Sequence, residues 1–521
     1  MSASVPLAAA RTPTRVAPLR RAMPATAPLA AAAVLGAAIA TRSPMLIALA
    51  LAPVALAAVS RIEWAPVLFA AGFYLNLPVL AVHDFHAPSA LASGFALLLL
   101  TPFLIYLVSE RRPLVITTAL PLLIGYFVVL ALSAILAPGV RPTPVGPIIT
   151  FLSEGLLLYL LVTNAVRTPR HVRAVLWTVV VAGAFMGLVS VWQEATHSYS
   201  HTLGGLAQVD TTGFNVGETL TGKKSHPRLA GPIGEKNRYA QVLLVLLPLA
   251  LSRVRVERRR TLRLLAAGCA ALILSGMALS FSRGAAVALV ILLALAAALR
   301  MVSLRKALAL LLAAVALVLV VAPDYLLRLQ SLGGADAALS QSSRAAPSRA
   351  SEVDAALQGR ATENVAAFHV FRDHPLLGVG PGQFFDRYSA QYGNALDLRF
   401  LDQNRRAHNL YLEIAADTGV LGLAAFVGLV GVTMVQLRRL SVFWRHRNRE
   451  LASLGDALLA ALIAYMASAI FLQLAYQRYF WFLLALANAT IWALRRETGG
   501  AADRHPAVHP PRHPLRPRRS A

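Results

Sequence analysis

The sequence predicts an all-α polytopic integral membrane protein with about 12–14 transmembrane helices and a large outer loop before the third-last helix. Its 521 residues are 57% hydrophobic and only 14% charged, more apolar than a soluble chain can keep inside one core. Apolar stretches that approach the length needed to cross a ~30 Å hydrocarbon layer recur along the whole chain. The basic residues fall in alternate connections between these stretches.

The first predicted span could be a cleaved signal peptide or a retained helix. The N-terminus resembles the front of a signal peptide, because an Ala/Leu stretch follows Arg11, Arg15, Arg20 and Arg21. Further spans follow at once, however, and Ala27–Ala40 holds no persuasive cleavage site, so we expect a retained helix. Whether 26–40 and 45–60 both span is open. The predicted spans fall near 26–40, 45–60, 64–81, 91–108, 114–137, 147–163, 174–194, 237–252, 261–280, 284–300, 305–322, 409–436, 455–474 and 478–495.

Positive charge orients these spans. Basic residues on cytoplasmic loops retain the loops inside, so the N-terminus is expected in the cytoplasm. The basic connections are at Arg61, Arg111–Arg112, Arg167–Arg173, Arg253–Arg263, Arg300–Lys306 and Arg438–Arg449. The formal net charge of +25 therefore reflects topology and attraction to anionic lipid, and we expect no nucleic-acid partner.

The alternation divides the chain into seven parts. They are a basic cytoplasmic N-terminus at 1–25, transmembrane helices at 26–194, an outer loop at 195–236, transmembrane helices at 237–322 with an outer turn at 281–284, a large outer loop at 323–408, transmembrane helices at 409–495 and a disordered basic cytoplasmic tail at 496–521. In the large loop, a mobile stretch is expected at Ser340–Ser351. A helical pattern from Arg360 to Phe371 then stops at His374-Pro375 and predicts a small folded cap.

Several chemistries find no support in the residues. The single cysteine, Cys269, lies in an apolar run, so no intrachain disulfide forms. The histidines lack the spacing of metal ligands, and Gly378–Gly382 resembles a turn more than a loop that binds phosphate. We therefore expect no metal and no cofactor.

Cations on the outer face are informative, because the positive-inside rule disfavours them there. Lys224, Arg228 and Arg238 lie close before or at the start of one span, and Arg283 lies in a very short turn between two others. Guanidinium groups match phosphate oxygens bidentately, so a lipid-linked phosphate or diphosphate is a fitting ligand. The plainer alternative is that such cations reach lipid phosphates or pair with carboxylates.

His408 lies at the mouth of a late span, on the same outer face. An imidazole can accept a proton from a hydroxyl or donate a hydrogen bond to a developing charge. A histidine at a helix start is more often a cap or a surface residue.

At His408 the sequence resembles the O-antigen ligase family, which shares a domain with O-antigen polymerases and with oligosaccharyltransferases that glycosylate protein hydroxyls. The resemblance covers roughly residues 225 to 436. Four motifs together carry the resemblance: His408-Asn409 followed by Gly419 and Gly422, His374-Pro375-Leu376-Leu377-Gly378-Val379-Gly380-Pro381-Gly382, Ser282-Arg283-Gly284, and Arg228-Leu229-Ala230-Gly231 with Asn237-Arg238-Tyr239-Ala240.

The resemblance implies a periplasmic, inverting, metal-independent glycosyltransferase in the bacterial inner membrane, whose donor is a glycan on undecaprenyl diphosphate. By analogy, Arg228 and Arg283 hold the diphosphate, with Lys224 and Arg238 as neighbours that could serve instead of Arg228. His408 and Arg283 are the expected catalytic residues. The large outer loop would be periplasmic, and would shape the glycan and acceptor sites.

Three functions stay open. The first is a ligase that moves a polysaccharide to a lipid A core sugar, in lipopolysaccharide biosynthesis. The second is a polymerase of O-antigen or exopolysaccharide, or a protein O-oligosaccharyltransferase, with the same donor and a glycan or protein acceptor. The third is a transporter of an anionic solute, which the scarcity of ionisable residues in the spans disfavours.

Overall fold

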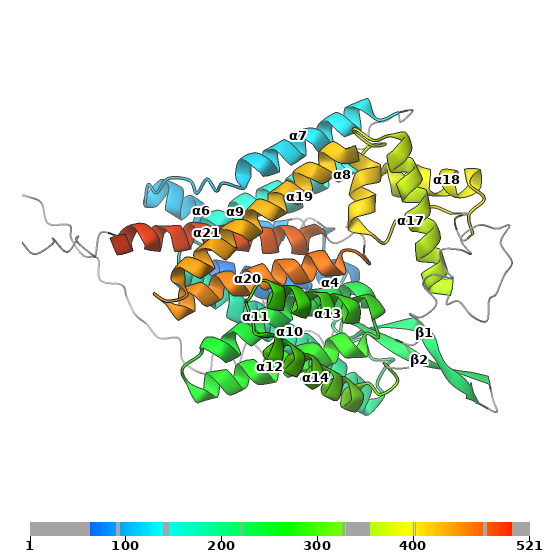
Figure 1. The fold of residues 1–521 in the computed structure, drawn as a ribbon, viewed down its shortest axis with the longest axis horizontal. Coiled ribbons are helices and arrows are strands. Elements are labelled where there is room, and N and C mark those ends of the chain that lie inside the picture. Colours follow the sequence, from blue (N-terminus) through cyan, green and yellow to red (C-terminus); the bar gives the residue numbers. More distant parts are fainter. Residues whose placement is uncertain are drawn as a thin grey trace, which may run out of the picture. The chain divides into compact units, whose positions relative to one another are not determined.

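Apolar helices make up most of the protein in the computed structural model (Figure 1). The structure describes residues 63–89, 94–138, 145–219, 222–325, 329, 355–399, 401, 403–472 and 477–502, without the side chains of 211–219, 222–225, 355–356, 477 and 499–502. All of these residues belong to one compact unit, Val54–Ala521.

Seven of the described helices are long and apolar enough to cross a membrane, or eight if the bent pair α3 (Ala65–Tyr74) and α4 (Leu77–His83) is one span. The all-α polytopic membrane class is thereby confirmed. The seven are Val145–Ala165 (α8, η3 and α9), α10 (Pro169–Thr196), α11 (Lys236–Val256), α12 (Arg260–Leu279), α14 (Leu304–Val321), α19 (Leu410–Trp444) and α20 (Arg449–Ser468).

This number is smaller than the 12–14 spans that the sequence predicts. Two of the predicted spans, 26–40 and 45–60, lie outside the described residues. Other predicted spans correspond to helices that are shorter or interrupted. One further span corresponds to α21, which is not among the seven helices given above. These helices are η1 (Phe95–Leu99), α6 (Leu100–Leu104), η2 (Ile105–Ser109), α7 (Leu120–Leu136), α13 (Arg283–Ala298) and α21 (Gln477–Ala502).

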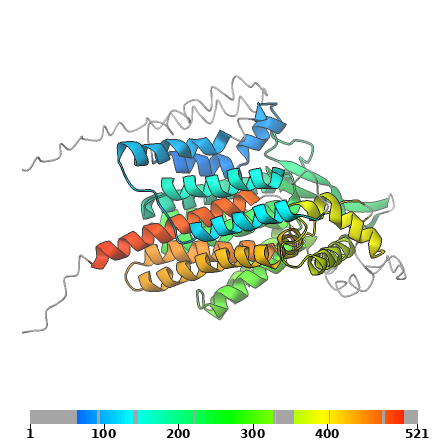
Figure 2. The ribbon, with the colours of Figure 1, turned by 90° about the horizontal axis from the view of Figure 1, so that it is seen from above.

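Helix α20 lies inside the bundle, where it packs against α11, α13, α19 and α21 (Figures 1 and 2). Of its most apolar 18-residue window, 89% is buried, whereas only 11% of the corresponding window of α14 is buried. The exposed leucines of α14, such as Leu308 and Leu312, fit a surface that faces lipid. The protein thus has an enclosed central helix and peripheral helices with an apolar outer face.

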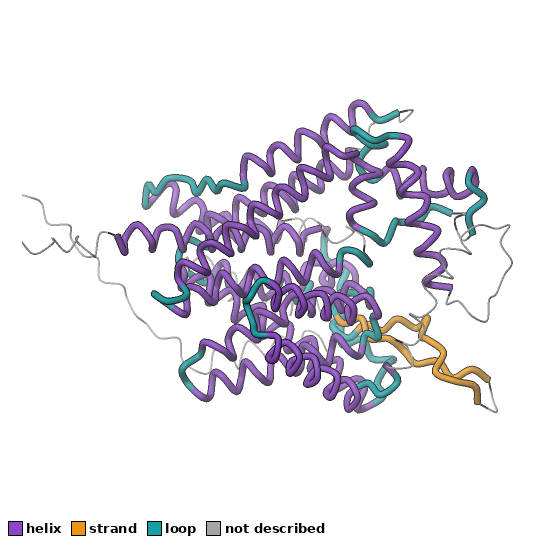
Figure 3. Tube along the Cα trace, in the orientation of Figure 1, coloured by secondary structure: helices purple, strands orange, loops and turns teal. Residues whose placement is uncertain are grey.

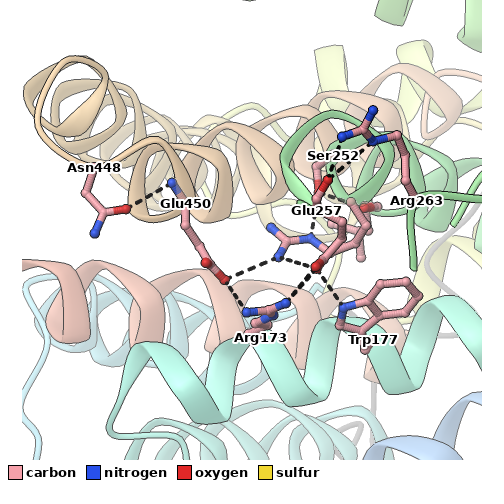
Figure 4. A network of polar contacts seen from close by, with 9 residues as sticks. Arg173, Trp177, Ser252, Glu257, Arg263, Asn448 and Glu450 are labelled. Carbon is pink, nitrogen blue, oxygen red and sulfur yellow. Dashed lines mark hydrogen bonds and ion pairs between the residues drawn. The ribbon is translucent and has the colours of Figure 1, made fainter. Parts of the chain in front are cut away.

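An ion-pair network joins α10, α11 and α20 at one end of the bundle (Figure 4). Arg173 donates from Nη2 to both carboxylate oxygens of Glu257, at 2.8 and 2.7 Å, and its Nη1 lies 2.9 Å from Glu450 Oε1. The fully buried Arg253 lies 3.8 Å from each carboxylate, and Trp177 donates to Glu257 at 3.1 Å. Two cations thus balance two anions, which offsets the cost of removing them from water.

The connection 195–236, expected as a loop, contains an antiparallel hairpin of β1 (Gln208–Thr219) and β2 (Gly222–Gly231), drawn in orange in Figure 3. The register pairs Asp210 with Arg228 and Phe214 with His226, with shifts between the paired segments. The segment is polar and rich in glycine, so it lacks the alternation of apolar residues that predicts a strand.

The later part of the connection 323–408 forms a small helical cap. It contains α17 (Ala355–Asp373), η5 (Phe384–Tyr388) and α18 (Ser389–Ala395). Its own core includes Val370, Val379 and Phe384. The predicted helix from Arg360 to Phe371 corresponds to α17, while Ser340–Ser351 lies outside the described residues. The cap and the hairpin lie at the same end of the bundle (Figures 1 and 2).

Helix α19 is broken at Gly419, whose φ of 66° and ψ of −167° are not helical. The cap supplies hydrogen bonds at this break. Val379 N donates to Ala416 O at 3.0 Å, and Val420 N donates to Pro375 O at 2.7 Å. The segment 374–384 is therefore bonded to the membrane helix through backbone groups that a straight helix would pair internally.

Candidate active site

The turn between α12 and α13 is buried and is held by Arg228 from the hairpin. Arg228 Nε donates to Ser280 O at 2.9 Å, and its Nη2 donates to Phe281 O at 3.2 Å. Phe281 has a φ of 50°, a left-handed conformation that a large side chain rarely adopts. The guanidinium group thus binds the carbonyls where α12 ends and where the helix dipole is negative.

Arg283, the first residue of α13, follows this turn and is buried. The preceding Ser282 is fixed from two directions. Its hydroxyl donates to Asn237 Oδ1 at 3.0 Å, and its carbonyl accepts the Tyr325 hydroxyl at 2.7 Å. Arg228 Nη2 lies 3.4 Å from the same Asn237 oxygen. The structure therefore brings Arg228 and the Arg283 turn together, next to the start of α11.

Arg238 belongs to the first turn of α11. Glu235 caps this helix, because its carboxylate accepts the N–H groups of Asn237 at 3.0 Å and of Arg238 at 2.9 Å. The Arg238 guanidinium also lies 3.8 Å from Glu235 Oε2. Lys224 lies on β2, opposite Gly217, and its side chain is outside what the structure describes. Its predicted role stays a prediction.

A small pocket lies beside this turn, and in this structure it is too narrow to hold a water molecule. Its polar residues are Asn237, Gln241, Ser282, Arg360 and Ser468. Its other residues are Gly284, Ala285, Phe471 and Leu472. Residues at the N-terminus of α13 thus line the pocket together with Arg360 from α17, and both a helix N-terminus and a cation favour an anion.

His408 lies at the start of α19 and contacts the cap. Its Nδ1 lies 2.7 Å from Glu363 Oε2 and 3.2 Å from Arg406 O. The Glu363 side chain is 2% exposed, whereas the imidazole is 32% exposed. His408 has a φ of 49°, which turns the chain sharply before the helix. One side of the ring is therefore held by a buried carboxylate, while the ring remains accessible.

The adjacent Asn409 has a structural role that explains why His408 and Asn409 occur together. Asn409 caps α19, since its Oδ1 accepts the N–H groups of Tyr411 at 3.0 Å and of Leu412 at 3.2 Å. Leu410 N donates to Ala469 O at 2.9 Å, directly after Ser468 of the pocket. The start of α19 is thus fixed beside the pocket.

Helix α17 connects the two halves of the site. Arg360 lines the pocket, and Glu363, one turn later, holds His408. Residues at this spacing share a helix face. The face of α17 that meets the membrane helices therefore serves both the pocket and the imidazole.

Sequence reasoning missed Arg360 and Glu363 as site residues. The helical pattern predicted α17 itself, and the spacing of an arginine and a glutamate one turn apart is visible in it. Nothing local signals that Glu363 meets a histidine 45 positions away. Among the described residues, no three His, Cys, Asp or Glu side chains gather as a metal site requires. Metal independence stays a prediction.

The fold and the pocket define a multi-pass membrane protein with a polar, cationic site at one end of its helix bundle. Residues 268–427 match the family model of O-antigen ligase, so the chain carries that domain. The match spans α12 to α19 and includes Arg283, Arg360, Glu363 and His408. No curated protein matches the chain. The matched family implies a membrane enzyme of the ligase or polymerase type, which transfers lipid-linked glycans.

Proposed function

We propose that this enzyme transfers a glycan from undecaprenyl diphosphate to a hydroxyl of a lipid A core sugar, at the periplasmic face of the bacterial inner membrane, with inversion and without a metal. The observation that carries the proposal is the pocket of Ser282, Asn237 and Arg360, which adjoins the start of the helix that follows His408. Of these residues, Ser282, Arg360 and His408 fall within the matched range 268–427. It combines a site suited to a diphosphate with a base suited to a hydroxyl.

On the donor side, Arg360, which lines the pocket, and the buried Arg283, whose neighbours Ser282 and Gly284 line it, bind the diphosphate, aided by the N-terminus of α13. Arg238 lies one residue beyond Asn237 of the pocket and adds positive charge. Arg228 has a different role in this proposal. Because its guanidinium binds the carbonyls of Ser280 and Phe281, it holds the turn that presents Arg283.

The apolar residues of the pocket suit the lipid part of the donor. Ala285, Phe471 and Leu472 lie beside the polar groups. A polyprenyl chain that enters from the bilayer can therefore contact apolar side chains while its diphosphate meets the cations.

On the acceptor side, His408 acts as the general base through Nε2. The acceptor oxygen forms a bond to the anomeric carbon while the bond from that carbon to the diphosphate oxygen breaks. The hydroxyl proton passes to His408, and undecaprenyl diphosphate leaves as an anion that the cations stabilise. Attack from the face opposite the leaving group inverts the anomeric centre.

The central test is a reconstituted transfer assay with purified protein and undecaprenyl-diphosphate-linked glycan. We expect release of undecaprenyl diphosphate with a lipid A core acceptor, in the presence of EDTA, and a product of inverted anomeric configuration by NMR. Transfer only to a second lipid-linked glycan would replace the ligase proposal with a polymerase. Transfer only to a peptide would indicate a protein oligosaccharyltransferase, and no release with any acceptor would overturn the proposal.

Variants test the residue roles. Arg283→Ala and Arg360→Ala should each weaken donor binding, seen as a raised KM for the donor. His408→Ala should lower kcat by about 10²–10⁴-fold. Arg372→Ala is the matched control, because Arg372 belongs to the same helix as Arg360 and its side chain is 60% exposed. Normal kinetics for both His408→Ala and Arg283→Ala would exclude this site.

The proposed orientation can be tested by cysteine labelling, since the sequence has a single cysteine, Cys269, which is buried. In a Cys269→Ala background, Arg372→Cys on the cap should react with an impermeant maleimide in cells with a permeabilised outer membrane. Arg447→Cys, in the basic connection after α19, should react only after lysis. The reverse pattern would exclude a periplasmic site.

A further inference from the structure

Glu363 is an unusual carboxylate, because it is almost fully buried and its shortest described contact is with an imidazole. Its Oε2 lies 2.7 Å from His408 Nδ1, and only 2% of its side chain is exposed. Burial of a carboxylate is costly unless hydrogen bonds compensate it. Burying the Glu363 carboxylate therefore costs free energy, and an ion pair at the surface would not require that burial.

The contacts of His408 define its tautomer. Nδ1 lies near two oxygens, the Glu363 carboxylate at 2.7 Å and the Arg406 carbonyl at 3.2 Å. A carbonyl only accepts hydrogen bonds, so both contacts are satisfied when Nδ1 carries the hydrogen. In the neutral ring, Nε2 then has the free lone pair that a general base needs.

Pairing with Arg405 is the alternative role for Glu363. Arg405 Nη1 lies 3.8 Å from Glu363 Oε1, and its side chain is 49% exposed. An ion pair of this length with a half-exposed partner is weak. The bond to His408 is shorter by more than 1 Å and uses the other carboxylate oxygen. The geometry thus favours the imidazole as the functional partner.

We propose that Glu363 is a positioning residue for the transfer reaction. It holds His408 in the Nδ1–H tautomer, turns Nε2 toward the acceptor hydroxyl and stabilises the imidazolium that forms when the hydroxyl proton arrives. The inference rests on the proposed function of His408 as the base. Through Glu363, the fold of the cap determines whether the base is correctly oriented.

Kinetics of single and double variants test this role. Glu363→Gln should lower kcat by about 10²-fold, the scale of general-base catalysis, with an unchanged KM for the donor. Glu363→Asp should retain part of the activity that Glu363→Ala loses. In a His408→Ala background, Glu363→Gln should cause no further loss, because Glu363 acts only through His408.

A matched control separates catalysis from stability. Glu257 is also a buried carboxylate that accepts a charged hydrogen bond of 2.7 Å, but it joins the network that contacts Glu450 at the start of α20. His408 neighbours the other end of this 20-residue helix, about 30 Å away. Glu257→Gln should lower the thermal stability in detergent while the folded protein keeps its kcat.

The outcomes distinguish the two proposals. If His408→Ala is inactive and Glu363→Gln keeps the kcat of the parent protein, the positioning role is wrong and the base assignment stands. The positioning role would also be wrong if Glu363→Gln lowered kcat by the same factor in the parent protein and in the His408→Ala background. If His408→Ala itself is fully active, the proposed function of His408 is wrong.

Discussion

The carboxylate of Asp417 accepts the backbone N–H of Gly382 at 2.8 Å. Its second oxygen accepts the N–H of Phe384 at 2.9 Å. Asp417 lies just before the break in α19, and the two N–H groups belong to the cap. The bonds therefore attach the cap to the membrane helix whose start carries His408.

Replacing Asp417 with Asn should loosen this attachment. An amide offers one oxygen, so one of the two backbone donors would face an NH₂ group and stay unsatisfied. We expect a destabilisation of about 1–3 kcal/mol, seen as a lower melting temperature in detergent. Asp386→Asn, on an exposed side chain of η5, should leave the melting temperature unchanged. Equal melting temperatures for both variants would contradict the role of Asp417.

Gly419 should tolerate no side chain. A Cβ there would lie 2.2 Å from the carbonyl of Leu376, and the φ of 66° is itself unfavourable for other residues. The backbone strain in Gly419→Ala alone should cost about 1–3 kcal/mol, and the clash should add to it. Gly428→Ala is the control in the same helix, because a Cβ there meets nothing within 4 Å. Thermal unfolding of the two variants checks the difference; similar stability would contradict a tight contact at Gly419.

The sequence predicted the membrane class and the position of the cap for physical reasons. Spans depend on local hydropathy, so long apolar helices such as α10 and α19 are visible in the chain. The helix α17 was predicted because Pro375 and the glycines after it end the pattern. Two of the four motifs are neighbours in the structure. Gly378–Gly382, in the motif that begins at His374, lies against Asp417–Gly419, in the motif that begins at His408.

What escaped prediction depends on contacts between distant residues. No local pattern indicated that Arg228 would bind the carbonyls of a turn more than 50 positions away. The same holds for Glu363 and His408. The hairpin was missed because its strands lack alternating apolar residues, although its backbone pairs are formed. Tertiary pairing, rather than hydropathy, determines these features.

Arg228 should prove sensitive to the shape of its side chain as well as to its charge. Arg228→Lys keeps the charge but loses the guanidinium group that reaches both Ser280 O and Phe281 O. We expect both Arg228→Lys and Arg228→Ala to lower stability, by about 1–3 kcal/mol for buried carbonyls left unpaired. Thermal unfolding of both variants, with Arg372→Lys as the exposed control, checks this. Parent-like stability of Arg228→Lys would instead favour a role through charge alone.

His226 should make the anchoring of the hairpin depend on pH. The hydrogen bond to Glu194 raises the pKa of His226 above its ordinary value of 6.5, although burial opposes the shift. The Pro227 carbonyl, at 2.7 Å from Nδ1, and the charge of Asp324 also favour the protonated ring.

Because the folded-state pKa of His226 is the higher one, its protonation stabilises the folded state. This contribution is fully present below about pH 6.5 and is lost as the pH rises through the raised pKa. The backbone amides of β2 should therefore become less protected from hydrogen exchange, after correction for the intrinsic pH dependence, as the pH rises from about 6.5 through the raised pKa of His226. His226→Gln should remove this pH dependence, since an amide does not titrate in the range. A parent protein whose corrected protection in β2 is constant across that range would show that the pair with Glu194 does not hold the hairpin.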